Sequence, residues 1–205
     1  MTDPVKIAVL VSGGGTNLQA LIDAEASGAL HSGRLSLVIS SREGAFALER
    51  AARAGIPSHV VTRAACGSQK TFEEQILKLL REYGIELIVL AGFMSILSVD
   101  FTAAYPNRIL NVHPSLIPSF CGKGFYGLRV HEAALAYGVK VTGATVHFVN
   151  EVPDGGKIIL QKAVEVRDGD TPEVLQRRVM EEAEWKLLPA AAELVSADIR
   201  RAGQR

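Results

Sequence analysis

The stretch KIAVLVSGGGTN, residues 6–17, decides the fold class. An apolar run of strand length leads through three glycines into a helical pattern, so we expect a strand at 6–12 and a helix from Thr16 to Ala26. Similar pairs of apolar runs and helical patterns follow along the chain. Strands that are apolar on both faces, with helices between them, are typical of a parallel sheet covered by helices on both sides.

The rest of the chain extends this sheet and then changes character. Further strands are expected at LSLVIS (35–40), SHVVT (58–62), LIVLAG (87–92) and RILNVH (108–113), with helices at 45–54 and 71–83. Two later strands, VTGATVHFV (141–149) and KIILQKAVEV (157–166), are joined by a loop of hairpin length. Thr71 and Glu74 have capping-box spacing. Thr171 and Pro172 predict the start of a long terminal helix.

The sequence therefore predicts an α/β fold: a mostly parallel, doubly wound sheet with a C-terminal β-hairpin and a long terminal helix. We expect one domain over residues 1–205, with an N-terminal half at about 1–105 and a C-terminal half at about 106–205.

Composition excludes some partners. Lys+Arg and Asp+Glu both number 22, so the net charge is +0 and gives no general attraction to nucleic acid or to an anionic membrane. Neither a signal peptide nor a run of about 18 apolar residues is recognisable, so we expect a cytoplasmic protein. Cys66 and Cys121 lack metal-ligand spacing and predict two unpaired thiols.

The loop SGGGTN, residues 12–17, has the features of an anion site. Its glycines let backbone N–H groups point together, and the N-terminus of the next helix adds positive potential. The loop lacks the Gly-Lys-Ser/Thr of a Walker loop, and Leu18 stands where a dinucleotide fingerprint needs its third glycine. A single phosphate therefore fits better than a dinucleotide, while a tight turn without a ligand stays open.

A second polar feature lies in LNVHPSLIPSF, residues 110–120. Side chains alternate along a strand, so Asn111 and His113 share one face at its carboxyl end, where ligands bind in open α/β sheets. An Asn amide can donate to a developing oxyanion, and a His can exchange a proton near neutral pH. A His near a core is more often only hydrogen-bonded, so both interpretations stay open at this point.

Asp154 is a plausible third member of this group. It precedes Gly155 and Gly156 in the hairpin loop. A carboxylate beside an imidazole favours the protonated ring and raises its pKa. Taken alone, Asp154 is equally a turn residue.

Together these motifs resemble the phosphoribosylglycinamide formyltransferases, the folate-dependent transformylases of purine synthesis. The matching pieces, in the family's order, are SGGGTNLQALIDA (12–24), VLAGFMSIL (89–97), RILNVHPSLIPSF (108–120), GATVHFVNEVPDGGKIILQ (143–161) and the helix after GDTPE. The resemblance implies a formyltransferase-type Rossmann-like fold. The methionyl-tRNA formyltransferases and the formyltetrahydrofolate hydrolases carry an additional domain that 205 residues do not accommodate.

The resemblance implies a reaction. The amine of glycinamide ribonucleotide would attack the formyl carbon of 10-formyltetrahydrofolate, while Asn111 and protonated His113 hold the oxyanion. Asp154 would raise the pKa of His113 and help pass protons to the leaving folate nitrogen. No metal and no protein nucleophile would be needed. The expected partners are these two small molecules, with no nucleic acid and no membrane, and the chain would act as a monomer or homodimer.

The resemblance also implies binding residues. Ribonucleotide contacts are expected at Gly14, Gly15, Thr16, Asn17 and Glu184. Folate contacts are expected at Gln69, Met94, Ser95, Ile96, Leu97, Asn111, Asn150, Glu151, Val152, Pro153 and Asp154.

Several positions depart from the family pattern. Gln69, which Lys70 follows, and Ser95 stand where some relatives have a basic residue. The terminal helix has one residue more before Glu184 than the family pattern. Trp185 follows Glu184 at a position where relatives commonly have a His. The segment after Phe120, CGKGFYGLRVHEAAL, is several residues longer than in many relatives. It predicts either a glycine-hinged flap over the site or a tolerated surface insertion.

Three other functions stay open. A formyltetrahydrofolate hydrolase would use the same three residues with water as nucleophile, but it needs no phosphate loop. An NAD(P)-dependent oxidoreductase would need the glycine fingerprint and an acidic residue after the second strand, and the sequence has neither. A non-catalytic binding protein would not need Asn111, His113 and Asp154 together.

Overall fold

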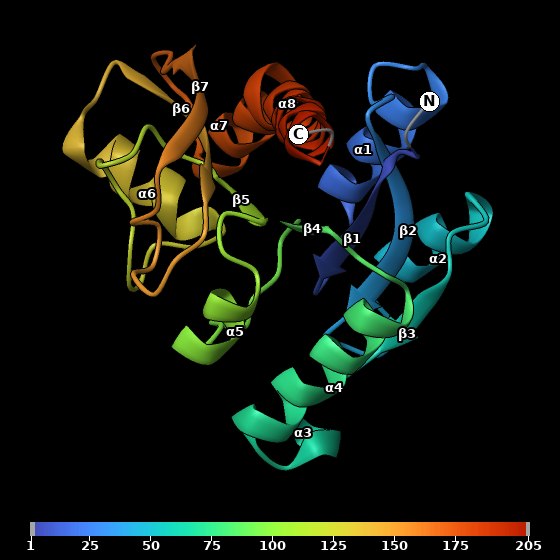
Figure 1. Cartoon of the computed structure of the whole chain (residues 1–205). Helices are drawn as coiled ribbons and strands as arrows, with labels where there is room; N and C mark the ends of the chain where they lie inside the picture. The colour runs from blue at the N-terminus through green and yellow to red at the C-terminus, as the bar shows by residue number, and fades with distance from the viewer. Residues whose placement is uncertain (1–2, 204–205) are drawn as a thin grey trace.

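A computed structural model of the chain describes residues 3–203, and one seven-stranded sheet runs through them (Figure 1). The strand order is β3-β2-β1-β4-β5-β6-β7. Its members are β1 (Val5–Val11), β2 (Gly33–Ser40), β3 (Ser58–Val60), β4 (Leu87–Leu90), β5 (Ile109–His113), β6 (Val141–Phe148) and β7 (Ile158–Glu165). All neighbouring strands from β3 to β5 pair in parallel. Strand β6 pairs antiparallel with β5 on one side and with β7 on the other. The predicted parallel sheet with a C-terminal hairpin is confirmed.

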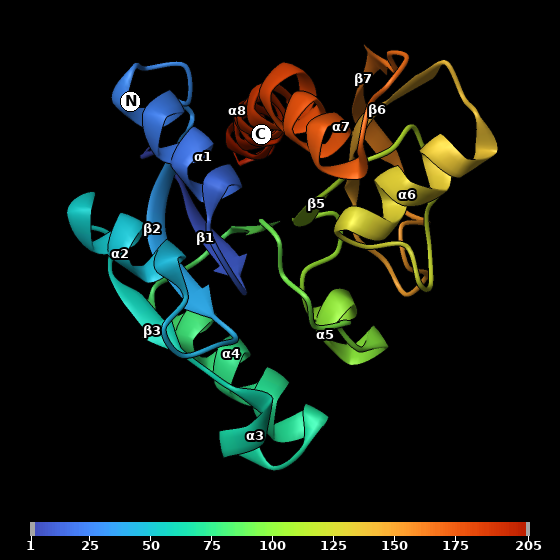
Figure 2. The same ribbon diagram turned by 180° about the vertical axis from the view of Figure 1, so that it is seen from behind.

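Helices cover both faces of this sheet. They are α1 (Thr16–Ala26), α2 (Phe46–Arg53), α3 (Arg63–Cys66), α4 (Gln69–Glu82), α5 (Val99–Ala104), α6 (Leu128–Tyr137), α7 (Pro172–Val179) and α8 (Trp185–Ala202). Because side chains alternate along β1, Ile7 and Val9 join the core under α1 and α8, while Ala8 and Leu10 join the core under α4 and α5. In Figures 1 and 2, α8 lies above β4 and β5 with α1 next to it, whereas α4 and α5 lie below these two strands.

The topology brings two loops and the end of a third strand together at the carboxyl ends of the parallel strands. From β1 the chain moves outward to β2 and β3, and it then returns to the other side of β1 as β4. Ligands of open α/β sheets bind at the carboxyl ends of the strands beside such a reversal. Here the loop after β1, the loop after β4 and the end of β5 meet at that point.

The sequence missed some helix details. Helix α4 starts at Gln69, because the Ser68 side chain accepts a hydrogen bond from the Thr71 backbone N–H and caps the helix. The predicted capping box at Thr71 and Glu74 is therefore wrong. Helices α3 and α5 have four and six residues, which is too short for a helical period to be visible.

The terminal helix was predicted from the correct residue. Thr171 caps α7 by accepting from the Val174 N–H. Between α7 and α8 the helix widens into a π turn, η1 (Met180–Glu184). A π turn accommodates one residue more than an α turn. The turn lies at the position where the resemblance indicated one additional residue before Glu184.

The described part of the chain also bears on cysteines, metals and membranes. Cys66 and Cys121 are free thiols, as predicted. Within residues 3–203, no group of three or more His, Cys, Asp or Glu side chains is placed to hold a metal ion. No helix in the same range is long and apolar enough to cross a bilayer.

Candidate active site

A cavity of about 900 Å³ lies at the carboxyl ends of β1, β4 and β5. Residues 13–17 and 91–96 form one part of its wall, and residues 111–114 lie at the end of β5. The remaining wall comes from residues 122–127 and 153–154 and from Gln176, Met180 and Glu184. The segment after Phe120 therefore lines the cavity, in agreement with the flap interpretation of its glycines.

The three predicted catalytic residues meet in this cavity. Asp154 reaches in from the loop between β6 and β7. Its Oδ2 lies 3.5 Å from Nδ1 of His113, and its Oδ1 lies 3.5 Å from Nδ2 of Asn111. Gly156 lets the loop come this close, because a Cβ there would lie 1.7 Å from the Phe148 carbonyl oxygen. The Asp-Gly-Gly motif thus delivers the carboxylate to the end of β5.

His147 is a fourth member that the sequence reasoning missed. It pairs with Asn111 across the antiparallel β5–β6 register. Its Nδ1 lies 2.8 Å from the Phe148 carbonyl oxygen, which can only accept, so Nδ1 carries the hydrogen. Its Nε2 lies 3.3 Å from Nδ2 of Asn111 and 3.5 Å from Oδ1 of Asp154, so His147 sits against both side chains. Asp154 can only accept, so the NH2 group of Asn111 faces it with one hydrogen, and the second hydrogen can be offered to a substrate.

His113 is almost completely buried, with 4% of its surface exposed. Its Nε2 donates to the Phe120 carbonyl oxygen at 2.8 Å, and Nδ1 faces Asp154. Burial lowers the pKa of His113, and the Asp154 charge and the Phe120 carbonyl only partly offset this effect. The expectation of a raised pKa is thus corrected: Asp154 acts in the predicted direction, but the loss of solvation is larger.

The Asp154 carboxyl responds in the opposite way. Burial alone would raise its pKa, but His147, His113 and the Gly122 N–H together outweigh burial and hold the pKa below its usual value. The Gly122 N–H donates to Oδ2 at 2.8 Å. Asp154 is therefore ionised at neutral pH, next to a ring that can take up a proton.

The glycine loop forms the opposite wall. Gly15, with φ +71°, is the N-cap of α1, and a Cβ there would lie 2.7 Å from the Ala47 Cβ. No side chain caps α1. The first N–H groups of the helix have no partner within the helix and are left for a ligand. Open space surrounds the positions that a Cβ would take at Gly13 and Gly14.

Glu184, for which the resemblance implies a ribonucleotide contact, lies beside this loop and lines the cavity. Asn17 donates through Nδ2 to Glu184 Oε2 at 2.8 Å, and both residues are buried. Burial raises the pKa of Glu184, with the Asn17 hydrogen bond acting against it. Gln176 and Met180, one helical turn or more before Glu184, are further wall residues that the sequence did not single out.

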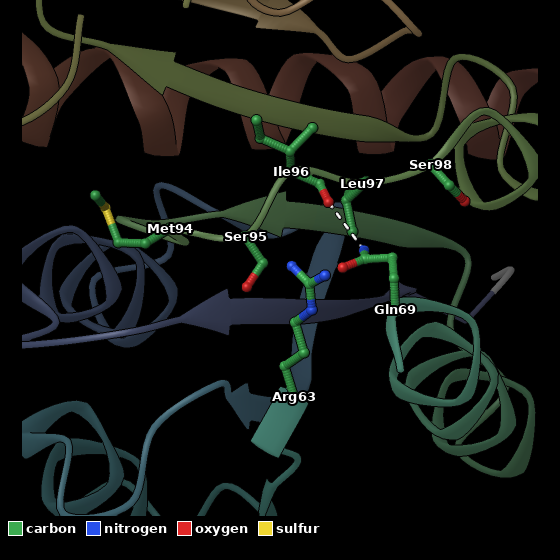
Figure 3. A pocket seen from close by; sticks show the side chains of 7 residues that line it. All are labelled: Arg63, Gln69, Met94, Ser95, Ile96, Leu97 and Ser98. Atoms are coloured by element: carbon green, nitrogen blue, oxygen red, sulfur yellow. Dashed lines mark hydrogen bonds between the residues drawn. The ribbon is translucent and has the colours of Figure 1, made fainter. Parts of the chain in front are cut away.

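A smaller hollow of about 490 Å³ adjoins the cavity and shares Met94, Ser95 and Ile96 with it (Figure 3). Gln69 and Leu97 line only this hollow. The Gln69 amide donates to the Ile96 carbonyl at 3.0 Å and to Glu73 at 2.6 Å, so it is already engaged within the protein. Among the described residues that line the hollow, the one with a cationic side chain is Arg63, whose guanidinium extends toward Ser95 and Gln69 in Figure 3.

Three of the predicted folate residues lie apart from both hollows. Asn150, Glu151 and Val152 line neither of them, although Pro153 and Asp154 line the cavity. The Asn150 side chain instead accepts from the Val152 N–H at 3.0 Å and shapes the hairpin loop.

The sequence pattern of the family described as formyl transferase matches residues 5–192. The chain belongs to the formyl transferase family. It is 41% identical over 175 residues to phosphoribosylglycinamide formyltransferase of Escherichia coli (strain K12), covering 85% of this chain and 80% of that protein. It is 45% identical over 203 residues to the trifunctional purine biosynthetic protein adenosine-3 of Gallus gallus, covering 99% of this chain. The chain spans only 20% of the length of that larger protein.

Solved structures agree with the family assignment. Glycinamide ribonucleotide transformylase 1 from Symbiobacterium toebii superposes with a TM-score of 0.89 at 45% identity, covering 95% of this chain and 89% of that one. The predicted formyltransferase-type Rossmann-like fold is thereby confirmed.

Proposed function

We propose that the chain transfers the formyl group of 10-formyltetrahydrofolate to the amine of N1-(5-phosphoribosyl)glycinamide. The products are the N-formyl ribonucleotide and tetrahydrofolate, a step of de novo purine (IMP) biosynthesis in the cytoplasm. One observation carries the proposal: Asn111, His113 and Asp154 share a single cavity with the glycine loop. The names of the bacterial relative and of the superposed structure support the same reaction.

The chemistry follows from the charges that develop. The amine lone pair forms a bond to the formyl carbon, and the carbonyl electrons move to the oxygen. An Asn111 N–H donates to that oxyanion, and the positive charge of protonated His113 stabilises it from nearby. When the tetrahedral intermediate collapses, the bond to the folate nitrogen breaks. This nitrogen takes up one proton and the former amine loses one, with His113 and ionised Asp154 passing the proton from the amine to the folate nitrogen.

The two substrates divide the cavity between them. The ribonucleotide phosphate binds the free amides of residues 13–17, with Glu184 contacting the ribonucleotide from the terminal helix. The pterin lies along 94–97 and 153–154. The smaller hollow continues from there, and Arg63 in it offers the positive charge for the folate carboxylates that the neutral Gln69 and Ser95 lack. The chain needs no other partner and works as a monomer or homodimer.

The test is an acceptor comparison. Tetrahydrofolate release from 10-formyltetrahydrofolate is followed with and without the ribonucleotide, using the purified chain. We expect release only when the ribonucleotide is present, because its amine is the nucleophile. Release at the same rate without it would show that water is the nucleophile and that the chain is a hydrolase.

A further inference from the structure

The proposed substrate cavity has an uneven balance of charge. Its lining includes Asp154 and Glu184, and among its described wall residues the one Lys or Arg is Lys123. A phosphate monoester brings a charge of about −1.5 to −2 at neutral pH. The amides of the glycine loop and the α1 N-terminus supply only partial positive charge, roughly half a unit. The Arg50 guanidinium is bonded to the Gly14 carbonyl and to Gln19, both at 2.9 Å, and it does not line the cavity, so a full counter-charge that faces the cavity has to come from another wall.

Lys123 stands at the corner of a tight turn. The Phe125 N–H donates to the Gly122 carbonyl at 3.1 Å, so Lys123 and Gly124 are its two central residues. Gly124 has φ +96°, the conformation that the second central residue of a type II turn requires. The Lys123 side chain is exposed, and no hydrogen bond or ion pair engages it among residues 3–203. Its ammonium group is thus available to an anion.

The base of this segment is bonded to the catalytic residues. The Gly122 N–H, immediately before Lys123, donates to Asp154 at 2.8 Å. Two residues earlier, the Phe120 carbonyl accepts from His113 at 2.8 Å. An insertion that only decorated the surface would not need these bonds. The backbone that carries Lys123 is therefore held in place by the catalytic pair.

We propose that Lys123 binds the phosphate of the ribonucleotide from the wall opposite the glycine loop. The contact makes residues 120–127 a clasp that closes on the nucleotide substrate while its base holds Asp154 and His113. This inference rests on the proposed function and adds a binding residue to it. The carboxylates of the folate are the competing anion, and they form a separate outcome of the test.

The experiment compares two acceptors, the ribonucleotide and its dephosphorylated ribonucleoside. In the Lys123→Ala variant, kcat/KM for the ribonucleotide should fall by about 10- to 100-fold, the effect of losing one hydrogen bond between charged groups. The value for the ribonucleoside should stay close to that of the unmodified chain. Lys123→Arg should keep most of the preference. Lys78→Ala, on the exposed face of α4 and outside the cavity lining, is the matched control.

Each contrary outcome is distinct. An equal loss with both acceptors would mean that Lys123 does not contact the phosphate. A rise in the Michaelis constant for the folate substrate alone would assign Lys123 to the folate carboxylates and overturn the inference. If the unmodified chain formylates neither acceptor, the proposed function fails as well. If it formylates the ribonucleotide and Lys123→Ala keeps the full preference, only the clasp fails.

Discussion

At the scale of single residues, the orientation of Asn111 is fixed by its neighbours. Asp154 presents an acceptor 3.5 Å from Nδ2 of Asn111, and the His147 ring lies 3.3 Å from the same nitrogen. Asn111→Ala removes the donor that we assign to the oxyanion, and kcat should fall by about 100- to 1000-fold. The comparison variant is Gln75→Ala, which changes an exposed amide on α4 outside the cavity. Near-normal kcat in folded Asn111→Ala would exclude this residue from the oxyanion site.

His113 should be at least as sensitive. Removing a general acid or base lowers a rate by about 100- to 10,000-fold, so His113→Ala should fall in that range. His59, which bonds the Tyr83 hydroxyl at 2.9 Å away from the cavity, offers a histidine control. The measurement compares the single-turnover rates of His113→Ala and His59→Ala. Similar rates in both would remove His113 from the mechanism.

Asp154 should control the pH dependence of the reaction. Its negative charge raises the pKa of His113 against the larger lowering by burial. Asp154→Asn removes the charge, so the pKa of His113 should fall further and less imidazolium should remain at a given pH. The alkaline limb of the kcat/KM profile should therefore move to lower pH. A limb that stays in place or moves upward would show that Asp154 does not act through His113.

His131 should make folding stability depend on pH. It is fully buried on α6, and neither ring nitrogen has a hydrogen-bond partner among the described residues. Burial, and then the neighbouring His113 charge, lowers the pKa of His131 to about 4. The unfolded chain therefore binds the proton more readily, and this contribution to stability is complete above pH 6.5 and lost as the pH falls toward 4.

A variant isolates this contribution. His131→Leu should reduce the loss of unfolding free energy between about pH 7.5 and about pH 5, measured by urea titration of the folded protein. An identical pH dependence in the variant would show that other groups are responsible.

The sequence was sufficient for part of the site. Asn111 and His113 were predictable because strand alternation puts them on one face and β5 ends beside them. His147 was not, because its place depends on the antiparallel register with β5. The signal in the sequence was that His147 is a polar residue inside the apolar run 141–149. Arg63 lies beside Ser95 only through the packing of α3 near the loop after β4, which no spacing in the sequence reveals.

At the scale of elements, the π turn η1 should absorb a deletion. Removing Glu181, which is exposed, would leave an ordinary α turn without rotating α8 against α7. The thermal midpoint should change little. Removing Leu194 from the middle of α8 would turn the following residues by roughly 100° and displace buried Val195 and Ser196. A large loss in the Glu181 deletion, comparable to the Leu194 deletion, would contradict this account of η1.

Elements were predictable where they are long. Apolar runs marked every strand, and Thr171 with Pro172 marked the terminal helix. The start of α4 was misplaced because two capping candidates, Ser68 and Thr71, lie three residues apart. The hydroxyl of Ser68 meets the free N–H of the first turn, and Thr71 is already inside the helix.

At the scale of the whole molecule, one sheet joins the two halves of the chain. The glycine loop comes from the first half, whereas β5, the hairpin loop and the terminal helix come from the second. The class of fold followed from the apolar runs, but the strand order did not, because it depends on contacts between distant residues. The cavity exists only because this order places the ends of β1, β4 and β5 together.

The most direct test of the central claim follows the formyl carbon itself. 10-Formyltetrahydrofolate labelled with ¹³C in the formyl group is mixed with the chain and the ribonucleotide, and the label is traced by NMR. The account predicts that the label appears on the glycinamide nitrogen of the ribonucleotide and that Asn111→Ala slows its appearance. Label recovered as free formate while the ribonucleotide remains unlabelled would contradict the account.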